Sequence, residues 1–348
     1  MITEGFANFQ CYRIWYRVAK SAISNSAAPI LLLHGGPGLG SDYFEPLEAM
    51  AHQGRTVVRF DQLGSGRSDR PRDLELWKIE GVLKQIDCVR KALGLDRIHL
   101  LGHSWGGMVA LEYLLTRPSG VLSACLCSSV VGVQLWADEA HRLRLSMPPH
   151  ISKALDRCAR SYRPPKQPDA GAKPARSWTQ EKIDRWARIM KVLFPFISHP
   201  LASALASLIS YLPILRLRSV AYLPLSIQFS LKHDCRLQPM PFAIFRMQAG
   251  SNDDIHATLI GPTEFYPTGI LKDWDITPRL SQICCPTLIL SGLHDKATQP
   301  QMEILKRGIP DSEQIILQQS SHCGMWEEPD KFRAAILGFI NRFEFADR

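Results

Sequence analysis

Short apolar runs alternate with helical patterns over the first third of the chain. Between the second and third runs, Val82, Ile86, Val89 and Leu93 recur at spacings of four, three and four, which predicts one face of an amphipathic helix ending at Gly94. This alternation predicts βαβ units and a mostly parallel sheet flanked by helices. The four predicted strands are Ile30–Leu33, Thr56–Phe60, Ile98–Leu101 and Ala124–Cys127.

The alternation stops after the fourth strand and resumes near the C-terminus. Thr287–Leu290 and Gln314–Leu317 predict two more strands, and a helix from Pro329 to Phe343 closes the chain. The interruption therefore predicts an enlarged helical cap inserted between strands of one sheet, an arrangement that suits a chain of 348 residues. We expect a core of residues 1–135 and 274–348 and a cap of residues 136–273.

Two segments of the predicted cap differ from the rest of the chain. Arg160–Arg176 is rich in proline, glycine and basic residues, which predicts an exposed loop. Val192–Leu215 contains no charged residue, but its longest piece without proline, Leu201–Leu212, would be about 18 Å long as a helix, against about 30 Å for a bilayer core. We therefore expect no transmembrane span.

The Leu201–Leu212 piece carries a leucine-rich stripe at helical spacing, with serines off the stripe. We expect the stripe to pack on the body of the protein. A wall for a bulky apolar substrate and an interfacial contact with a membrane are the alternatives. The stripe consists of Leu201, Leu205, Leu208, Ile209 and Leu212, and the serines are Ser203, Ser207 and Ser210.

Charge and cysteine content narrow the functional classes. The net charge is +8, but an excess of seven positive charges lies between Lys153 and Lys191, so the rest of the chain is nearly neutral and no nucleic acid partner is expected. The nine cysteines form no two-armed zinc pattern, so we expect no metal and no organic cofactor. The N-terminus lacks a signal-peptide apolar region, which favours reduced thiols in a cytoplasmic protein.

A nucleophile motif follows the third predicted strand. Gly102–Gly106 (GHSWG) fits G-x-S-x-G between a strand and a helix, the context in which a sharp turn exposes the serine hydroxyl. Serine needs a general base held by an acid. Asp295 and His322 follow the last two predicted strands, in the chain order Ser–Asp–His of α/β hydrolases. We therefore predict a catalytic triad of Ser104, Asp295 and His322 rather than a chance match.

Glycines after the first predicted strand suggest an oxyanion hole. The segment His34–Gly38 (HGGPG) would let backbone N–H groups turn toward the serine, and the expected donors are the N–H groups of Gly36 and Trp105. The alternative is a plain Gly-Pro turn. His34 is interpreted as a structural residue that orients this loop, and Cys323 as a thiol lining the pocket rather than a nucleophile.

The chain resembles the proline iminopeptidase family of α/β hydrolases in segments distributed along its length. These segments are HGGPG (34–38), DQLGSGRSDRP (61–71), GHSWGG (102–107), GPTEF (261–265), LKDWD (271–275) and SHCGMWEEP (321–329). The resemblance implies the α/β-hydrolase fold, the Ser104–Asp295–His322 triad, and release of a proline-like N-terminal residue from a small peptide or amide. It also implies that Trp326 contacts the substrate.

The resemblance further implies two acidic side chains that bind the free ammonium group of the substrate. One falls on Glu264, whereas the position directly after the triad aspartate is Lys296 here. A lysine would repel a substrate ammonium or pair with Glu264. The first alternative function is therefore an amidase, esterase or lactone-forming enzyme of a biosynthetic pathway, acting on a bulky apolar substrate without a free amine. The second is a ligand-binding protein without catalysis. The expected partner is a small molecule or short peptide, and the oligomeric state stays open.

Overall fold

The computed structural model describes residues 1–21, 27–161, 178–211 and 215–344. Its eight strands form one sheet in the order β1-β2-β4-β3-β5-β6-β7-β8. The strands are β1 (Ile2–Phe9), β2 (Tyr12–Ala19), β3 (Ile30–Leu33), β4 (Val57–Phe60), β5 (Ile98–His103), β6 (Val121–Cys127), β7 (Thr287–Gly292) and β8 (Ser312–Leu317). Most of the expected basic loop, residues 162–177, lies outside the described residues.

The six strands from β3 to β8 are parallel and include every strand that the sequence predicts. Each residue of β3, β4, β5 and β7 is buried, as expected for parallel strands covered on both faces. The hairpin β1–β2 was not predicted. It joins the sheet through antiparallel pairing of β2 with β4, and its exposed side chains interrupt the apolar pattern that identified the other strands.

Helices of the core cover both faces of the sheet. One face packs against α2, α3 and α11, and the other packs against η1 and α13. Gly94, at φ 63°, ends α2 where the sequence predicts its end. The bounds are η1 (Asp42–Gln53), α1 (Leu74–Trp77), α2 (Ile79–Leu93), α3 (Trp105–Leu115), η2 (Thr277–Gln282), α11 (Gln299–Gly308), α12 (Gly324–Glu327), α13 (Pro329–Ile340) and η3 (Asn341–Phe343).

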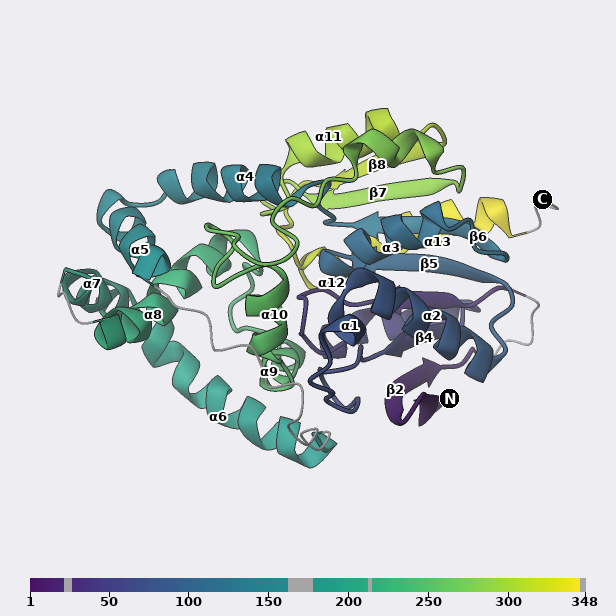
Figure 1. Ribbon diagram of the computed structural model, residues 1–348, viewed down its shortest axis with the longest axis horizontal. Coiled ribbons are helices and arrows are strands. Elements are labelled where there is room, and N and C mark those ends of the chain that lie inside the picture. Colours follow the sequence, from purple (N-terminus) through teal and green to yellow (C-terminus); the bar gives the residue numbers. More distant parts are fainter. Residues whose placement is uncertain (22–26, 162–177, 212–214, 345–348) are drawn as a thin grey trace.

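Among the described residues, seven α-helices lie between β6 and η2, and we refer to them as the cap. They gather beside the sheet, on the left in Figure 1. An isolated bridge between Gly132 and Asp275 joins the segment that enters the cap to the segment that leads back to the sheet. The first cap helix begins at Val133, slightly before the expected boundary at residue 136. The cap helices are α4 (Val133–Leu145), α5 (Pro149–Ser161), α6 (Gln180–Ser198), α7 (Pro200–Ile209), α8 (Leu215–His233), α9 (Phe242–Ala249) and α10 (Asp253–Leu259).

The orientation of α7 contradicts the expectation that its leucine stripe packs on the body. Leu201, Leu205 and Leu208 are 73%, 58% and 68% exposed, whereas the serines on the opposite side are buried. Ser207 and Ser210 donate their hydroxyls to backbone carbonyls one turn earlier, which satisfies them in the interior. Leu212, the last residue of the stripe, lies outside the described residues.

Taken singly, none of the described helices is long and apolar enough to cross a bilayer. The consecutive pair α6 and α7 meets the criteria of length and composition only when combined, and the two helices are bent by 74° at their junction.

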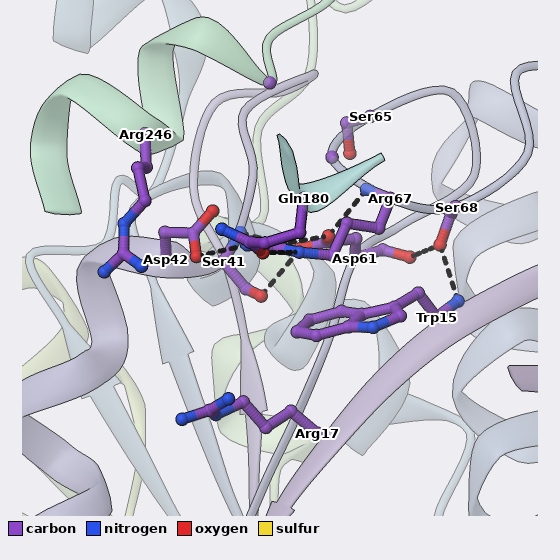
Figure 2. Close-up of polar contacts among 12 residues, drawn as sticks. Trp15, Arg17, Ser41, Asp42, Asp61, Ser65, Arg67, Ser68, Gln180 and Arg246 are labelled. Atoms are coloured by element: carbon purple, nitrogen blue, oxygen red, sulfur yellow. Dashed lines mark hydrogen bonds and ion pairs between the residues drawn. The ribbon is translucent and has the colours of Figure 1, made fainter. Parts of the chain in front are cut away.

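A buried ion network connects the core to the first residue of the cap helix α6. Asp61 accepts hydrogen bonds from Ser41 and from the backbone and guanidinium of Arg67, and Arg67 also pairs with Asp42. Figure 2 shows Gln180 of α6 reaching the same guanidinium, with its amide oxygen 2.6 Å from Arg67 Nε. Burial alone would raise the pKa of Asp61, but Arg67 and the hydrogen bonds outweigh burial and lower it.

We expect Asp61→Asn to destabilise the fold by about 3–5 kcal/mol, because it leaves the buried guanidinium of Arg67 with less compensating charge. The lowered pKa of Asp61 means that its contribution is present above about pH 4, the range of an unfolded aspartate, and is lost as the pH falls toward the folded pKa. Urea unfolding at neutral and acidic pH measures both effects. The exposed Asp138→Asn is the control, and equal destabilisation by the two substitutions would contradict this role for Asp61.

Candidate active site

Ser104 stands on a sharp turn between β5 and α3. Its backbone has φ 56° and ψ −120°, a conformation that few residues other than glycine adopt. The flanking glycines are required by close packing: a Cβ on Gly102 would lie 2.3 Å from the carbonyl oxygen of Gly106, and a Cβ on Gly106 would lie 2.0 Å from that of Leu33. The turn therefore holds the hydroxyl clear of the sheet, as the motif predicts.

Asp295 and His322 lie together at the same edge of the sheet, after β7 and β8. His322 Nδ1 is 2.7 Å from Asp295 Oδ1, which also accepts the N–H of Ala297 at 2.8 Å. Ser104 and His322 line one cavity. Between these two described side chains no hydrogen bond is formed, a looseness that is common before substrate binds. The arrangement can fix the imidazole with Nδ1–H on Asp295 and Nε2 free to accept a proton.

The glycine loop after β3 turns backbone donors toward Ser104. Gly36 adopts φ 127°, and the N–H groups of Gly36 and Trp105 have no hydrogen-bond partner within the described ranges. Gln62 ties this loop to the nucleophile turn, because its N–H donates to His34 Nε2 and its side-chain oxygen accepts the indole N–H of Trp105. His34 is fully buried in this network, in agreement with its predicted structural role.

His103, which precedes the serine, joins the glycine loop to the histidine loop. The Tyr43 hydroxyl accepts the N–H of Gly35 at 2.7 Å and lies 2.9 Å from His103 Nδ1. His103 Nε2 lies 2.8 Å from the carbonyl oxygen of His322. Burial, and next the neighbouring His322, lowers the pKa of His103 to about 3, so this ring stays neutral and donates one hydrogen bond to His322.

The cavity beside Ser104 has a volume of about 420 Å³, within the range of small-molecule sites. Core residues form one wall, and the cap forms the other, mainly through apolar side chains of α6, α8 and α9, with the polar Ser226, Ser230 and Gln248 among them. Cys323 lines the cavity, and a hydrogen bond with Cys235, followed by burial, raises the pKa of its thiol well above the usual value. Trp326 lies outside this lining, and its indole N–H donates to the carbonyl of Tyr43 at 2.8 Å.

Lys296 fills an acidic pocket next to the triad. Its ammonium lies 2.8 Å from Asp234 Oδ1 and 3.2 Å from Glu264 Oε2. Asp234, directly after α8, is a site residue that sequence reasoning missed. Nothing in the local sequence of Asp234 indicates that the end of a cap helix meets the loop after β7. The same chain segment anchors the triad histidine, because the N–H of His322 donates to the carbonyl of His233 at 3.1 Å.

The charges of this cluster depend on one another. Burial alone would lower the pKa of Lys296, but Asp234 and Glu264 raise it, so the ammonium stays charged. Burial tends to raise the pKa of Asp234, and Lys296 outweighs burial and lowers it. For Glu264 burial prevails and the pKa is raised. The described residues contain no cluster of three or more metal-binding side chains.

Comparisons with known proteins identify the fold and the family of this chain. The family model for the alpha/beta hydrolase fold matches residues 28–193. A proline iminopeptidase of Levilactobacillus brevis is 30% identical over 342 residues, covering 97% of this chain and 96% of that protein. The chain belongs to the proline iminopeptidase family. A second relative of that name, from Lactobacillus delbrueckii, is 31% identical, covering 97% of this chain and 98% of its own.

Solved structures of similar proteins match this member of the proline iminopeptidase family over nearly its whole length. The proline iminopeptidase of Mycobacterium smegmatis is 28% identical with a TM-score of 0.76, covering 99% of this chain and 100% of that one. The structure of VinJ is 26% identical with the same TM-score of 0.76, covering 98% and 99%. The chain is therefore a serine hydrolase with the α/β-hydrolase fold.

Proposed function

We propose that this serine hydrolase cleaves an amide or ester of an apolar acyl group, and that the acyl group carries no free amine. Ser104 attacks the carbonyl carbon while His322 Nε2 takes its proton, and the N–H groups of Gly36 and Trp105 stabilise the oxyanion. The imidazolium then protonates the leaving group. Water, activated by His322, hydrolyses the acyl-enzyme and restores Ser104. Asp295 orients the imidazole throughout.

The observation that carries the substrate class is the ion pairing of Lys296. Its ammonium already contacts both carboxylates, Asp234 at 2.8 Å and Glu264 at 3.2 Å. A substrate ammonium would have to displace it, since two unit charges about 4 Å apart repel by about 4 kcal/mol at an effective dielectric near 20. Lys296 therefore acts as an internal substitute for the substrate amine.

The cavity supports an apolar acyl group. Beyond Ser104 its wall consists mainly of methionine, phenylalanine, leucine and isoleucine side chains from the cap. Methionine-rich walls adapt to flexible apolar chains. The apolar residues from the cap helices include Met190, Phe194, Leu223, Ile227, Ile244 and Phe245.

Release of a proline-like N-terminal residue is the second candidate. It is favoured by the names of the relatives and by the formal charge of the cluster, in which two carboxylates face one ammonium. A small free-amine substrate could then bind the carboxylate that Lys296 neutralises least, Glu264.

A panel of substrates with and without a free amine distinguishes the two candidate functions. We expect kcat/KM to be higher for an N-acetylprolyl arylamide than for the prolyl arylamide, and to rise along nitrophenyl esters from acetyl to decanoyl. Ile227→Trp, which fills the cavity from α8, should lower kcat/KM for the decanoyl ester more than for the acetyl ester. A strong preference of the wild type for the free amine would contradict the first candidate and support the second.

A further inference from the structure

The cap contains a helix, α7, whose polar side is buried and whose apolar side is exposed. On α7 the serine side is buried, and Leu201, Leu205 and Leu208 form a row at spacings of four and three on the outer surface. All three leucines are more than half exposed. Buried serines and exposed leucines are the opposite of what water favours, which points to an external apolar partner for this face.

The neighbouring helix α6 continues the apolar surface. One side of α6 packs inward through Ile183 and Ala187, which are fully buried. Its other side exposes five large apolar side chains by 41–73%. These residues are Trp186, Ile189, Val192, Leu193 and Phe196. We call them, together with Leu201, Leu205 and Leu208, the apolar face of the cap. Figure 1 shows α6 and α7 at the margin of the molecule away from the sheet.

Glu181 and Asp184 lie at the start of α6, but from Arg185 onward the charged residues of this helix are all basic. Arg185, Arg188 and Lys191 follow α6 at intervals of three, and all three are exposed. From Arg185 to His233 the sequence has no aspartate or glutamate. Such a surface complements an anionic one and repels a second copy of itself, because the second copy would bring the same basic residues.

The apolar face adjoins the substrate cavity. Met190 and Phe194 of α6 line the cavity from the side of the helix opposite to the apolar face. Leu223 of α8 lines the cavity and is also 51% exposed, so the cavity wall reaches the surface beside α6. An apolar molecule lying against this face would therefore be close to the entrance of the cavity.

We propose that the apolar face of the cap docks the protein on an anionic lipid bilayer. The leucines of α7 and the apolar side chains of α6 enter the boundary between headgroups and acyl chains, while Arg185, Arg188 and Lys191 contact the phosphates. Docking places the cavity entrance near the lipid phase, from which an apolar substrate can diffuse to Ser104. This docking role goes beyond the proposed hydrolysis, and binding of the protein to the bilayer requires no catalysis.

Co-sedimentation with vesicles tests the docking. Vesicles of equimolar phosphatidylcholine and phosphatidylglycerol should bind the wild type, and vesicles of phosphatidylcholine alone should bind it weakly. The variant Leu201→Ser/Leu205→Ser/Leu208→Ser should bind at least about tenfold more weakly, because it removes the inserted side chains. Replacing Arg185, Arg188 and Lys191 by glutamine should cost roughly fivefold for each charge and remove the preference for the anionic lipid.

A matched control separates this face from exposed apolar residues in general. Ile2, Leu145 and Ile270 are 52%, 69% and 45% exposed, and they lie outside α6 and α7. Their triple serine variant should bind vesicles as the wild type does. Because the substituted leucines are exposed, the α7 variant should keep its melting temperature and its hydrolysis of a short soluble ester. Ser104→Ala should bind vesicles normally, so loss of activity and loss of docking are distinguishable.

Three outcomes would overturn the proposal. The first is absence of wild-type binding to anionic vesicles at low salt. The second is equal binding by the wild type and the α7 serine variant. The third is a wild-type dimer in sedimentation velocity that the α7 variant abolishes while vesicle binding stays unchanged, which would assign the face to a second copy of the chain.

Discussion

Replacing Ser104 with alanine is expected to lower kcat by about 10⁴- to 10⁶-fold, because the nucleophile, the base and its orienting acid act as a unit. Labelling by a fluorophosphonate should disappear in the same variant. The fold should persist, since the Ser104 side chain makes no hydrogen bond with the described residues. Its backbone bonds do not depend on the side chain: the N–H donates to the carbonyl of Cys127 at 2.9 Å, and the carbonyl accepts the N–H of Gly107 at 2.8 Å. Active-site titration and steady-state kinetics measure the two effects.

The control for this experiment is Cys323→Ala, which removes a thiol that lines the cavity next to the triad histidine. Its labelling should persist, because the pKa of the Cys323 thiol is raised and the thiol stays protonated. Labelling that survives in Ser104→Ala, or that disappears in Cys323→Ala alone, would refute Ser104 as the nucleophile.

Replacing Lys296 with alanine should open the acidic pocket to a substrate amine. Asp234 and Glu264 would then face a space that a substrate ammonium can occupy, and kcat/KM for a prolyl arylamide should rise by roughly 5- to 150-fold, equivalent to about 1–3 kcal/mol. Without such a ligand the variant should lose about 3–5 kcal/mol of stability, because two carboxylates remain without their cation. A free-amine substrate analogue should restore part of the lost melting temperature.

Lys296→Met is the matched variant, because methionine fills the space of the lysine stem and brings no charge. It should share the loss of stability but gain less activity toward the free amine than Lys296→Ala does. The gain should also shrink at high salt if it is electrostatic. If Lys296→Ala leaves the ratio of free-amine to N-acetyl activity unchanged, the cluster of Lys296 does not select the substrate.

Most of the core could be predicted because its strands are parallel and covered on both faces. Such strands appear as uninterrupted apolar runs, as in Ile30–Leu33, and the six predicted strands are present in the structure. The hairpin β1–β2 was not predicted, because it lies at the edge of the sheet and its exposed and buried positions are mixed. The candidate triad was equally accessible, because Ser104, Asp295 and His322 each follow a strand and the carboxyl ends of parallel strands meet at one edge.

By itself, the sequence determined the six parallel strands, the place of the insertion and the residues expected to react, since these depend on local patterns and chain order. Only the tertiary structure brought Asp234 to Lys296, because that contact depends on how the end of α8 packs against the loop after β7. Only the tertiary structure, too, decided which side of α7 faces outward. Periodicity locates a stripe but does not say which side is buried, and serines that bond to their own helix can occupy the interior while leucines remain exposed.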